Sequence, residues 1–183
     1  QAGARTEGRA IAAKGLTGPG YDGHAFWDTE GFVLPALTCT HPQATADALR
    51  WRHSTLPLAR ERAQALGLQG AAFPWRTISG EETSAYWPAG TAAFHINGDI
   101  ARAIESYRLM TGDQSLEREC GQEMLIETAR LWRSLGHHDR DGRWHVDGVT
   151  GPDEYSAVAD DNVFTNLIAA RNLLAAAAAA ACR

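Results

Sequence analysis

Apolar residues recur at intervals of three and four over much of this chain, and this periodicity constrains the fold more than any other feature. One stripe follows Asp113, a residue suited to cap a helix N-terminus, and continues to Gly136. Its apolar members are Leu116, Cys120, Met124, Leu131 and Leu135. Further stripes run from about Thr91 to Met110, where Gly112 supplies a stop, and onward from about Asp161. These patterns predict long amphipathic helices.

The segment from Pro42 to Leu68 has the same helical spacing, and Pro57 is expected to kink it or to divide it in two. Between residues 137 and 149 the period is broken by Asp141-Gly142, after which apolar and polar residues alternate. That pattern predicts a short hairpin or an extended loop. Helices joined by tight turns and by long, aromatic-rich loops indicate an all-α fold of stacked helical hairpins.

Length and charge limit the classes of function. The chain has 183 residues, enough for one domain with a substantial core, and a formal net charge of −5 with its basic residues scattered. Because nucleic-acid-binding proteins gather basic residues on one face, we expect no nucleic-acid partner. The longest apolar run is alanine-rich and shorter than a membrane span requires, so we expect no membrane association.

Cysteine and histidine usage argues against disulfides and metals. The three cysteines, Cys39, Cys120 and Cys182, are an odd number and form no CxxC pair, so the sequence supports neither a disulfide framework nor a zinc site and suits a reducing cytoplasm. The histidines and acids of residues 137–145 lack the spacing of a calcium loop, and adjacent histidines on a turn point apart. We therefore expect a solvated loop there and no metal.

The stretch Gly148 to Tyr155 presents a carboxylic acid, Glu154, on a loop braced by glycine and proline. Pro152 and Tyr155 can limit the solvation of that carboxyl group and raise its pKa towards neutrality, which a general acid requires. Glu154 is therefore a candidate general acid, a residue that donates a proton to a leaving group. The alternative is that it caps the following helix or pairs with an arginine.

Residues 23–30 place two aromatic side chains beside two acids, the composition needed to grip a sugar ring. Trp27 and Asp28 are the candidates, and the alternative is that Trp27 belongs to the core while Asp28 caps a helix. Trp75 follows Phe73-Pro74 on a glycine-rich connection, where an exposed indole could stack on the C–H face of a sugar. An ordinary buried tryptophan is the alternative there.

These motifs, together with residues 70–75 (Gly-Ala-Ala-Phe-Pro-Trp) and 95–97 (His-Ile-Asn), closely resemble the catalytic domain of glycoside hydrolase family 65 from about Gly15 to Asn172. The resemblance implies that residues 1–183 are part of one (α/α)6 toroid, with an N-terminal β-sandwich domain and the later toroid helices outside this chain. It also implies an inverting phosphorylase that converts an α-linked glucosyl disaccharide and phosphate to β-glucose 1-phosphate and a free sugar.

The resemblance also assigns roles to particular residues. It makes Glu154 the proton donor, lets Trp27 and Asp28 hold the glucosyl unit, sets Trp75 near the leaving sugar and puts His95 in the part that varies with leaving-group preference. It implies no metal and no organic cofactor, with inorganic phosphate as co-substrate beside the disaccharide. For the intact protein, a cytoplasmic location and a homodimer are expectations.

Two other functions stay open. A hydrolase of the same fold needs a second carboxylate, about 6.5–9.5 Å from the acid, to activate water, and Asp28 and Glu30 are the only strong candidates for that role. The other alternative is a non-catalytic sugar-binding toroid. Among phosphorylases, Asp153 and the Gly-Glu-Glu-Thr sequence at 80–83 favour the kojibiose or trehalose type.

A half-ring would leave helix faces such as Ile96, Ile100 and Ile104 without partners, so we expect the isolated chain to be inactive and poorly stable.

Overall fold

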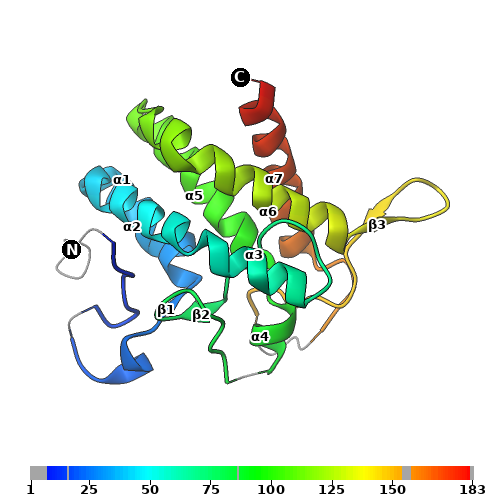
Figure 1. Ribbon diagram of the computed structural model, residues 1–183, viewed down its shortest axis with the longest axis horizontal. Helices are drawn as coiled ribbons and strands as arrows, with labels where there is room; N and C mark the ends of the chain where they lie inside the picture. The colour runs from blue at the N-terminus through cyan, green and yellow to red at the C-terminus, as the bar shows by residue number, and fades with distance from the viewer. Residues whose placement is uncertain (1–7, 16, 86, 154–157, 182–183) are drawn as a thin grey trace.

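Figure 1 shows the computed structural model, which describes residues 8–15, 17–85, 87–153 and 158–181. Most of these residues are helical. The α-helices are α1 (Leu34–Thr40), α2 (Pro42–Ser54), α3 (Leu56–Ala65), α4 (Trp87–Ala92), α5 (His95–Thr111), α6 (Gln122–Leu135) and α7 (Val163–Ala181). The wider π-helical turns η3 (Thr29–Val33) and η4 (Glu117–Gly121) lead directly into α1 and α6, and η2 (Gly20–Gly23) is a 3₁₀ turn. The mostly helical fold agrees with the predicted class.

Pro57 divides the first predicted helix in two, as expected. It lies in the first turn of α3, where its missing N–H costs no helical hydrogen bond. Thr55 lies between α2 and α3 and stabilises the end of α2. Its backbone N–H and its hydroxyl both donate to the carbonyl of Arg52, at 3.1 and 2.8 Å.

The helix predicted from Thr91 to Met110 is instead two elements, since α4 ends shortly before α5 begins. Asn97 organises the break. Its Nδ2 donates to the carbonyl of Phe94 at 2.9 Å, and its Oδ1 accepts the backbone N–H of Phe73 at 2.8 Å. The first turn of α5 therefore holds a neighbouring loop rather than continuing α4.

Helix α5 lies at the centre of the core and packs against α1, α2, α6 and α7. Its stripe of Ile96, Ile100 and Ile104 is at most 1% exposed, which corrects the expectation that these side chains lack partners in this chain. Gly98 allows the close approach of α7, because a Cβ at that position would lie 2.6 Å from Cγ1 of Ile168.

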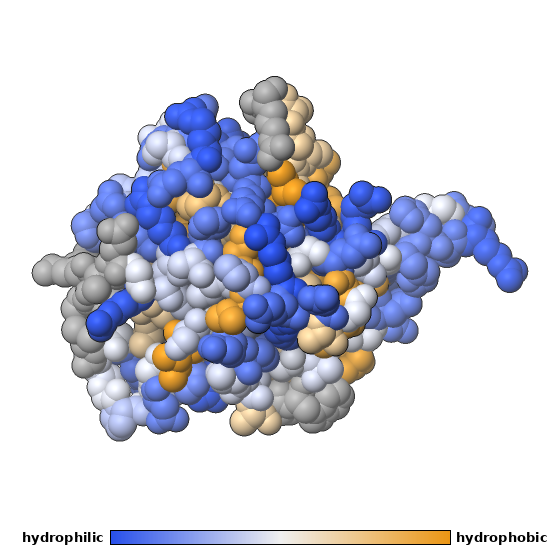
Figure 2. Space-filling view, in the orientation of Figure 1, coloured by the Kyte–Doolittle hydropathy of each residue, from blue (hydrophilic) through white to orange (hydrophobic). Residues whose placement is uncertain are grey.

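The outer face of α7 is apolar and exposed. Val163, Leu167 and Leu174 are 82%, 62% and 73% exposed, and Figure 2 shows apolar residues along this helix. By length and composition α7 could cross a membrane, and it is longer than the alanine run noted above. Core helices of globular proteins share that property, and the inner face of α7 packs on α5 and α6.

Two small antiparallel ladders complete the fold. Strand β1 (Ala25–Phe26) pairs with β2 (Arg76–Thr77), and β3 (His137–His138) pairs with β4 (Trp144–His145). The second pair is the hairpin predicted within residues 137–149, and it extends away from the helices in Figure 1. The first pair was not predicted, and it brings together two of the loops that carry candidate residues.

Candidate active site

The β1–β2 ladder places Asp28 and Trp75 at one cavity. Just beyond the ladder, the backbone N–H of Trp27 donates to the carbonyl of Trp75 at 3.2 Å. The neighbouring cavity has a volume of about 420 Å³, within the usual range for small-molecule sites, and Asp28 and Trp75 both line it. Other residues of its wall are Tyr21, Phe26 and Arg76.

Trp75 is held at this cavity by its backbone and by its ring. Its N–H donates to Oε2 of Glu82 at 2.7 Å, while Oε1 of Glu82 accepts the N–H of Ser84 at 2.9 Å. The Trp75 ring meets that of Phe26 edge to face, with centroids 5.2 Å apart. The side chain is partly buried rather than fully enclosed, so the indole borders the cavity.

The glycine-rich connection before Trp75 is fixed against three helices. Gly70 has a φ of +74°, and a Cβ there would collide with the backbone oxygen of Glu127, so only glycine fits without displacement. The N–H groups of the next two residues donate to backbone carbonyls in α6 and α3, at 3.1 and 2.9 Å. Because Asn97 on α5 also binds this segment, Trp75 stands at the end of a rigid support.

Arg62 is a further support that the sequence pattern did not reveal. Its guanidinium donates to the carbonyls of Ala72 and Phe73, at 3.2 and 3.0 Å, and to that of Gly90 at 2.7 Å. Burial lowers the pKa of Arg62, and the Glu82 carboxylate 3.8 Å away opposes that effect. An arginine on a helix gives no sequence signal that its partners are loop carbonyls.

Trp27 lies in the core beside the site rather than in the cavity wall. Its ring is 9% exposed and meets the imidazole of His95 at 88°, with centroids 4.9 Å apart. Phe164 completes the cluster, at 6.3 Å from Trp27 and 5.7 Å from His95. Within the described residues, the structure therefore brings together Trp27 with His95, and Asp28 with Trp75, in two adjoining groups.

His95 is fully buried and oriented by an acid. Its Nδ1 lies 2.9 Å from Oδ2 of Asp99, and its Nε2 has no hydrogen-bond partner within the described part of the chain. Burial raises the pKa of Asp99, an effect that the hydrogen bond from His95 opposes. The buried acid was not singled out from the sequence, although its spacing of four from His95 on a helix is the available signal.

Asp28 and Glu30 differ in their surroundings. Asp28 is exposed, whereas Glu30 is 3% exposed and its Oε1 lies 2.7 Å from Nη2 of Arg52, itself fully buried. Burial raises the pKa of Glu30, and the adjacent Arg52 opposes the effect. Glu30 is thus enclosed in an ion pair, which removes it from the two carboxylates considered as a base for water.

Glu154 lies outside the described residues, and the structure describes the segments on either side of it, up to residue 153 and from residue 158. The backbones of Val149 and Ala159 pair through hydrogen bonds of 3.0 and 2.8 Å. The N–H of Thr150 donates to the carbonyl of Ala92, the last residue of α4, at 3.0 Å. The base of the loop is therefore attached to the segment that precedes His95.

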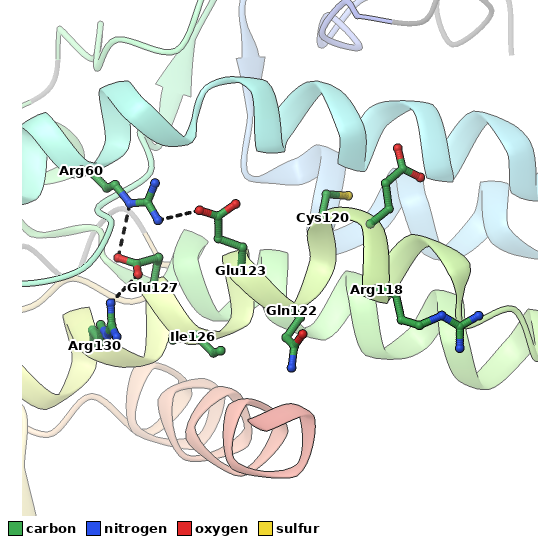
Figure 3. A pocket seen from close by; sticks show the side chains of 9 residues that line it. Arg60, Arg118, Cys120, Gln122, Glu123, Ile126, Glu127 and Arg130 are labelled. Atoms are coloured by element: carbon green, nitrogen blue, oxygen red, sulfur yellow. Dashed lines mark hydrogen bonds and ion pairs between the residues drawn. The ribbon is translucent and has the colours of Figure 1, made fainter. Parts of the chain in front are cut away.

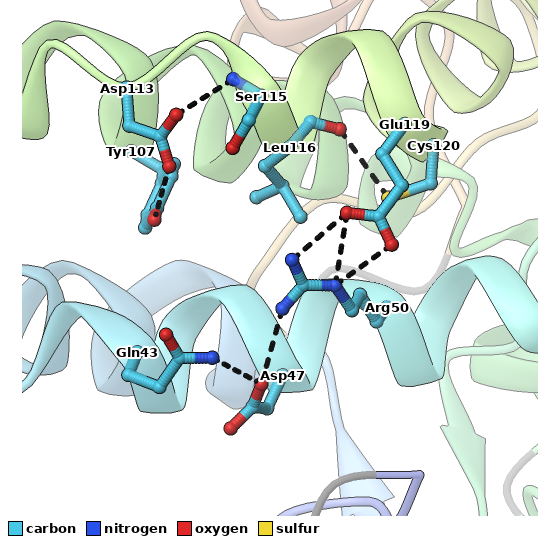
Figure 4. A network of polar contacts seen from close by, with 9 residues as sticks. All are labelled: Gln43, Asp47, Arg50, Tyr107, Asp113, Ser115, Leu116, Glu119 and Cys120. Carbon is cyan, nitrogen blue, oxygen red and sulfur yellow. Dashed lines mark hydrogen bonds and ion pairs between the residues drawn. The ribbon is translucent and has the colours of Figure 1, made fainter.

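The other polar clusters lie on the outside of the helices. A cavity of about 380 Å³ lies beside α3 and α6. Figure 3 shows how Arg60 of α3 bridges Glu123 and Glu127 of α6 at this cavity. Figure 4 shows Arg50 of α2 bound to Glu119. Exposed ion pairs of this kind contribute about 0–1 kcal/mol each. Among the described residues, no group of three histidines, cysteines and acids is arranged to hold a metal ion.

A helical domain with an indole and a carboxylate at a sugar-sized cavity fits a carbohydrate-active catalytic domain. The model of the glycosyl hydrolase family 65 central catalytic domain matches residues 1–182. The chain belongs to glycoside hydrolase family 65.

Curated relatives are longer and differ in activity. An uncharacterized glycosyl hydrolase of Mycobacterium tuberculosis is 76% identical over 97% of this chain and 22% of its own length. The α,α-trehalose phosphorylase of Geobacillus stearothermophilus is 51% identical, over 89% of this chain and 21% of its length. The kojibiose hydrolase of Flavobacterium johnsoniae is 37% identical, over 87% and 24%. The chain thus spans between a fifth and a quarter of these relatives.

A solved structure agrees with the family assignment. A human-microbiome protein provisionally assigned as a kojibiose phosphorylase matches with a TM-score of 0.91 and 32% identity, over 98% of this chain and 27% of that chain.

Proposed function

We propose that this chain is part of the (α/α)6 toroid of an inverting α-glucoside phosphorylase of the kojibiose or trehalose type. The enzyme would convert a glucosyl disaccharide and inorganic phosphate to β-glucose 1-phosphate and a free sugar. In this proposal the N-terminal β-sandwich and the later toroid helices lie in the remainder of a full-length protein, as the short coverage of the relatives suggests.

The observation that carries the proposal is the meeting of Asp28 and Trp75 at one cavity. They come from loops far apart in the sequence, and the β1–β2 ladder joins those loops. A carboxylate that accepts hydroxyl hydrogen bonds and an indole that stacks on C–H faces are the two contacts a pyranose needs. We assign Asp28 to the glucosyl unit and Trp75 to the neighbourhood of the leaving sugar.

Trp27 and His95 have a second role in the same proposal. The imidazole rests against the indole, and its buried Nε2 has no hydrogen-bond partner among the described residues, so in the proposal it meets a sugar hydroxyl. If Nδ1 carries the proton that binds Asp99, then Nε2 is an acceptor. Trp27 would shape the floor of the glucosyl subsite, with His95 supplying a polar contact where that subsite meets the leaving sugar.

Glu154 supplies the proton in the proposed reaction. It donates to the glycosidic oxygen as the C–O bond breaks, so that the leaving sugar departs as a neutral alcohol. A phosphate oxygen attacks the anomeric carbon from the opposite face, which inverts its configuration. Glu154 ends as a carboxylate and recovers a proton from solvent or phosphate.

Phosphate as nucleophile fits the carboxylates available. Phosphate arrives as an anion and needs no general base, whereas water does. Glu30 is enclosed by Arg52, and Asp28 lines the cavity assigned to the sugar, so neither of the two carboxylates considered as a base is left for that role. A hydrolase is the alternative, favoured by the kojibiose hydrolase among the relatives, and its base would come from the remainder of the protein.

The remaining features of the proposal concern location and partners. We propose a cytoplasmic enzyme that needs no metal or organic cofactor and that binds no nucleic acid or membrane. The scattered basic residues and the lack of a CxxC pair in the sequence support this view, and a homodimer is the proposed assembly.

The test uses the full-length protein with trehalose, kojibiose, nigerose and maltose, each with and without phosphate. We expect β-glucose 1-phosphate only when phosphate is present. Equal release of glucose without phosphate would identify a hydrolase, and no reaction on any sugar would leave a sugar-binding domain.

The acid is tested by comparing two classes of substrate. Glu154→Gln should slow disaccharide phosphorolysis by about 10²–10⁴-fold, because the amide has no proton to give. Turnover of α-glucosyl fluoride, whose leaving group needs little protonation, should change much less. Glu61→Gln, an exposed glutamate on α3, is the matched control. A Glu154→Gln enzyme that keeps more than half of its activity on the disaccharide would remove this residue from the mechanism.

A further inference from the structure

His145, at the end of β4, lies between two carboxylates from different parts of the chain. Its Nδ1 lies 2.6 Å from Oδ2 of Asp161, and its Nε2 lies 3.2 Å from Oδ2 of Asp139. The other oxygen of each carboxylate binds backbone. Oδ1 of Asp139 accepts hydrogen bonds from the backbone N–H groups of Asp141 and Arg143 in the hairpin turn. Oδ1 of Asp161 accepts one from the backbone N–H of Val146. His145 therefore joins the β3–β4 hairpin to the segment just before α7, a contact that the sequence did not reveal.

The same cluster stands at the base of the loop that carries Glu154. The Val149–Ala159 pair joins the two described segments that flank Glu154 in the sequence. Next to that pair, the backbone N–H of Asp161 donates to the carbonyl of Val146 at 2.8 Å. The backbone pairing at the base therefore extends to Asp161, whose side chain binds His145. The position of the base therefore depends on contacts that include the imidazole.

The charge of His145 decides how many of these contacts it can make. An imidazolium donates from both nitrogens and satisfies both carboxylates, whereas a neutral imidazole donates from one and turns a lone pair towards the other. The hydrogen bonds with Asp161 and Asp139 raise the pKa of His145. In turn, the hydrogen bond with His145 lowers the pKa of Asp161 to about 2.

Other titratable groups around the cluster are mostly acidic. The ring of His137 lies 5.6 Å from that of His145, and a carboxylate oxygen of Asp147 lies 3.6 Å from Nδ1 of His137. On the side of the loop, Asp160 accepts the backbone N–H of Gly148 at 2.9 Å. The surroundings of His145 thus favour its cationic, doubly bonded form.

We propose that His145 is a positioning residue for the general acid: it fixes the paired segments around Val149 and Ala159, between which the chain carries Glu154, and acid catalysis depends on that fixed pair. The inference rests on the proposed function. His145 acts through the backbone of the loop and does not contact the reacting atoms.

The first test compares His145→Gln with His138→Gln in the full-length protein. His138 is an exposed histidine on the same hairpin and is the matched control. We expect His145→Gln to lower kcat on trehalose or kojibiose by about tenfold or more, since misplacement of a catalytic group of about 1 Å can cost that much. Turnover of α-glucosyl fluoride, which needs little acid assistance, should stay within about twofold.

A residue that only supports the fold would affect both substrates alike. Equal losses on the disaccharide and on the fluoride, or no loss on either, would therefore overturn the proposal. The pH profile gives a second readout, because the wild type should lose the proposed positioning as pH rises through the raised pKa of His145, and the variant should lack this limb.

Hydrogen exchange in the same proteins tests the loop without reference to activity. We expect the amides of Val149 and Ala159 to lose protection in His145→Gln, and to lose it in the wild type as pH rises above the raised pKa of His145. Amides of α5 report any global unfolding. Unchanged protection at the base would overturn the proposal. Absence of turnover on every sugar would instead refute the proposed function, and the exchange result would still decide whether His145 holds the loop.

Discussion

His95 and Asp99 lie one turn apart on α5, with Nδ1 of the imidazole 2.9 Å from Oδ2 of the carboxylate and both side chains fully buried. Asp99 thereby binds Nδ1 of the imidazole, while Nε2 has no hydrogen-bond partner among the described residues. Because the ring also rests on Trp27, its direction is fixed by packing as well as by the hydrogen bond.

Asp99→Asn should reverse the hydrogen-bonding character of His95. The amide can donate to Nδ1, which would place the imidazole proton on Nε2 and turn that atom from an acceptor into a donor. We expect kcat/KM for α-glucosides to fall by roughly tenfold to a hundredfold in the full-length protein, as for the loss of a hydrogen bond of about 1.5–3 kcal/mol. Steady-state kinetics with an unchanged melting temperature would support this account, and unchanged kinetics would exclude it.

Asp28→Asn should weaken the handling of the glucosyl unit with every disaccharide, because that unit is common to all of them. Loss of a charged acceptor should cost about 1.5–3 kcal/mol in kcat/KM. Asp22→Asn is the matched control, since Asp22 is an exposed acid of the same loop. A change confined to leaving-sugar preference would move Asp28 to the other subsite.

Arg52→Met should destabilise the chain far more than Arg50→Met. Removing Arg52 leaves Glu30 buried without its partner, at a cost of about 3–5 kcal/mol in the free energy of unfolding. Arg50 lies two residues away, on the opposite, outer side of α2, where its partly exposed pair with Glu119 is worth less than about 1 kcal/mol. Urea unfolding of the two variants measures the difference.

The pH dependence of Arg52→Met follows from the raised pKa of Glu30. A carboxyl group whose pKa is raised by folding is tolerated better when it is protonated, so the deficit of this variant should shrink as pH falls towards that raised pKa. The double variant Arg52→Met/Glu30→Leu should recover most of the loss at neutral pH. A deficit equal in the single and double variants would contradict the explanation.

Gly98→Ala should destabilise the α5–α7 contact although alanine is the better helix former. The helical gain is about 0.8–1.0 kcal/mol, whereas overpacking against Ile168 should cost about 1–3 kcal/mol. Gly90→Ala is the control, because the nearest atom to a Cβ there is 3.5 Å away. Thermal melting should show a loss for Gly98→Ala and none for Gly90→Ala.

The sequence predicted the elements that local periodicity encodes. The division at Pro57 and the hairpin after Gly136 both follow from proline and turn chemistry close in sequence. The β1–β2 ladder was missed, because two-residue strands carry no period and their partners are far apart in the chain. The break before α5 was missed for a related reason, since the partner of Asn97 is the backbone of a distant loop.

The candidate site was predicted in part. Aromatic and acidic residues in loops identified Asp28 and Trp75, which line one cavity. The sequence could not distinguish Asp28 from Glu30, two positions later, because their difference lies in a long-range partner, Arg52. His145 was set aside as part of a solvated loop for the same reason, since Asp161 approaches it only in the folded chain.

The guanidinium of Arg62 ties the carbonyl of Phe73 to that of Gly90, and so joins the support of Trp75 to α4. These two segments cannot shift independently. If one moved, the buried guanidinium of Arg62 would lose a carbonyl acceptor, and little water is present to replace it. If Trp75 contacts the leaving sugar, as proposed, then the two segments set substrate preference together. Changing it by single substitutions in one segment should require compensation in the other.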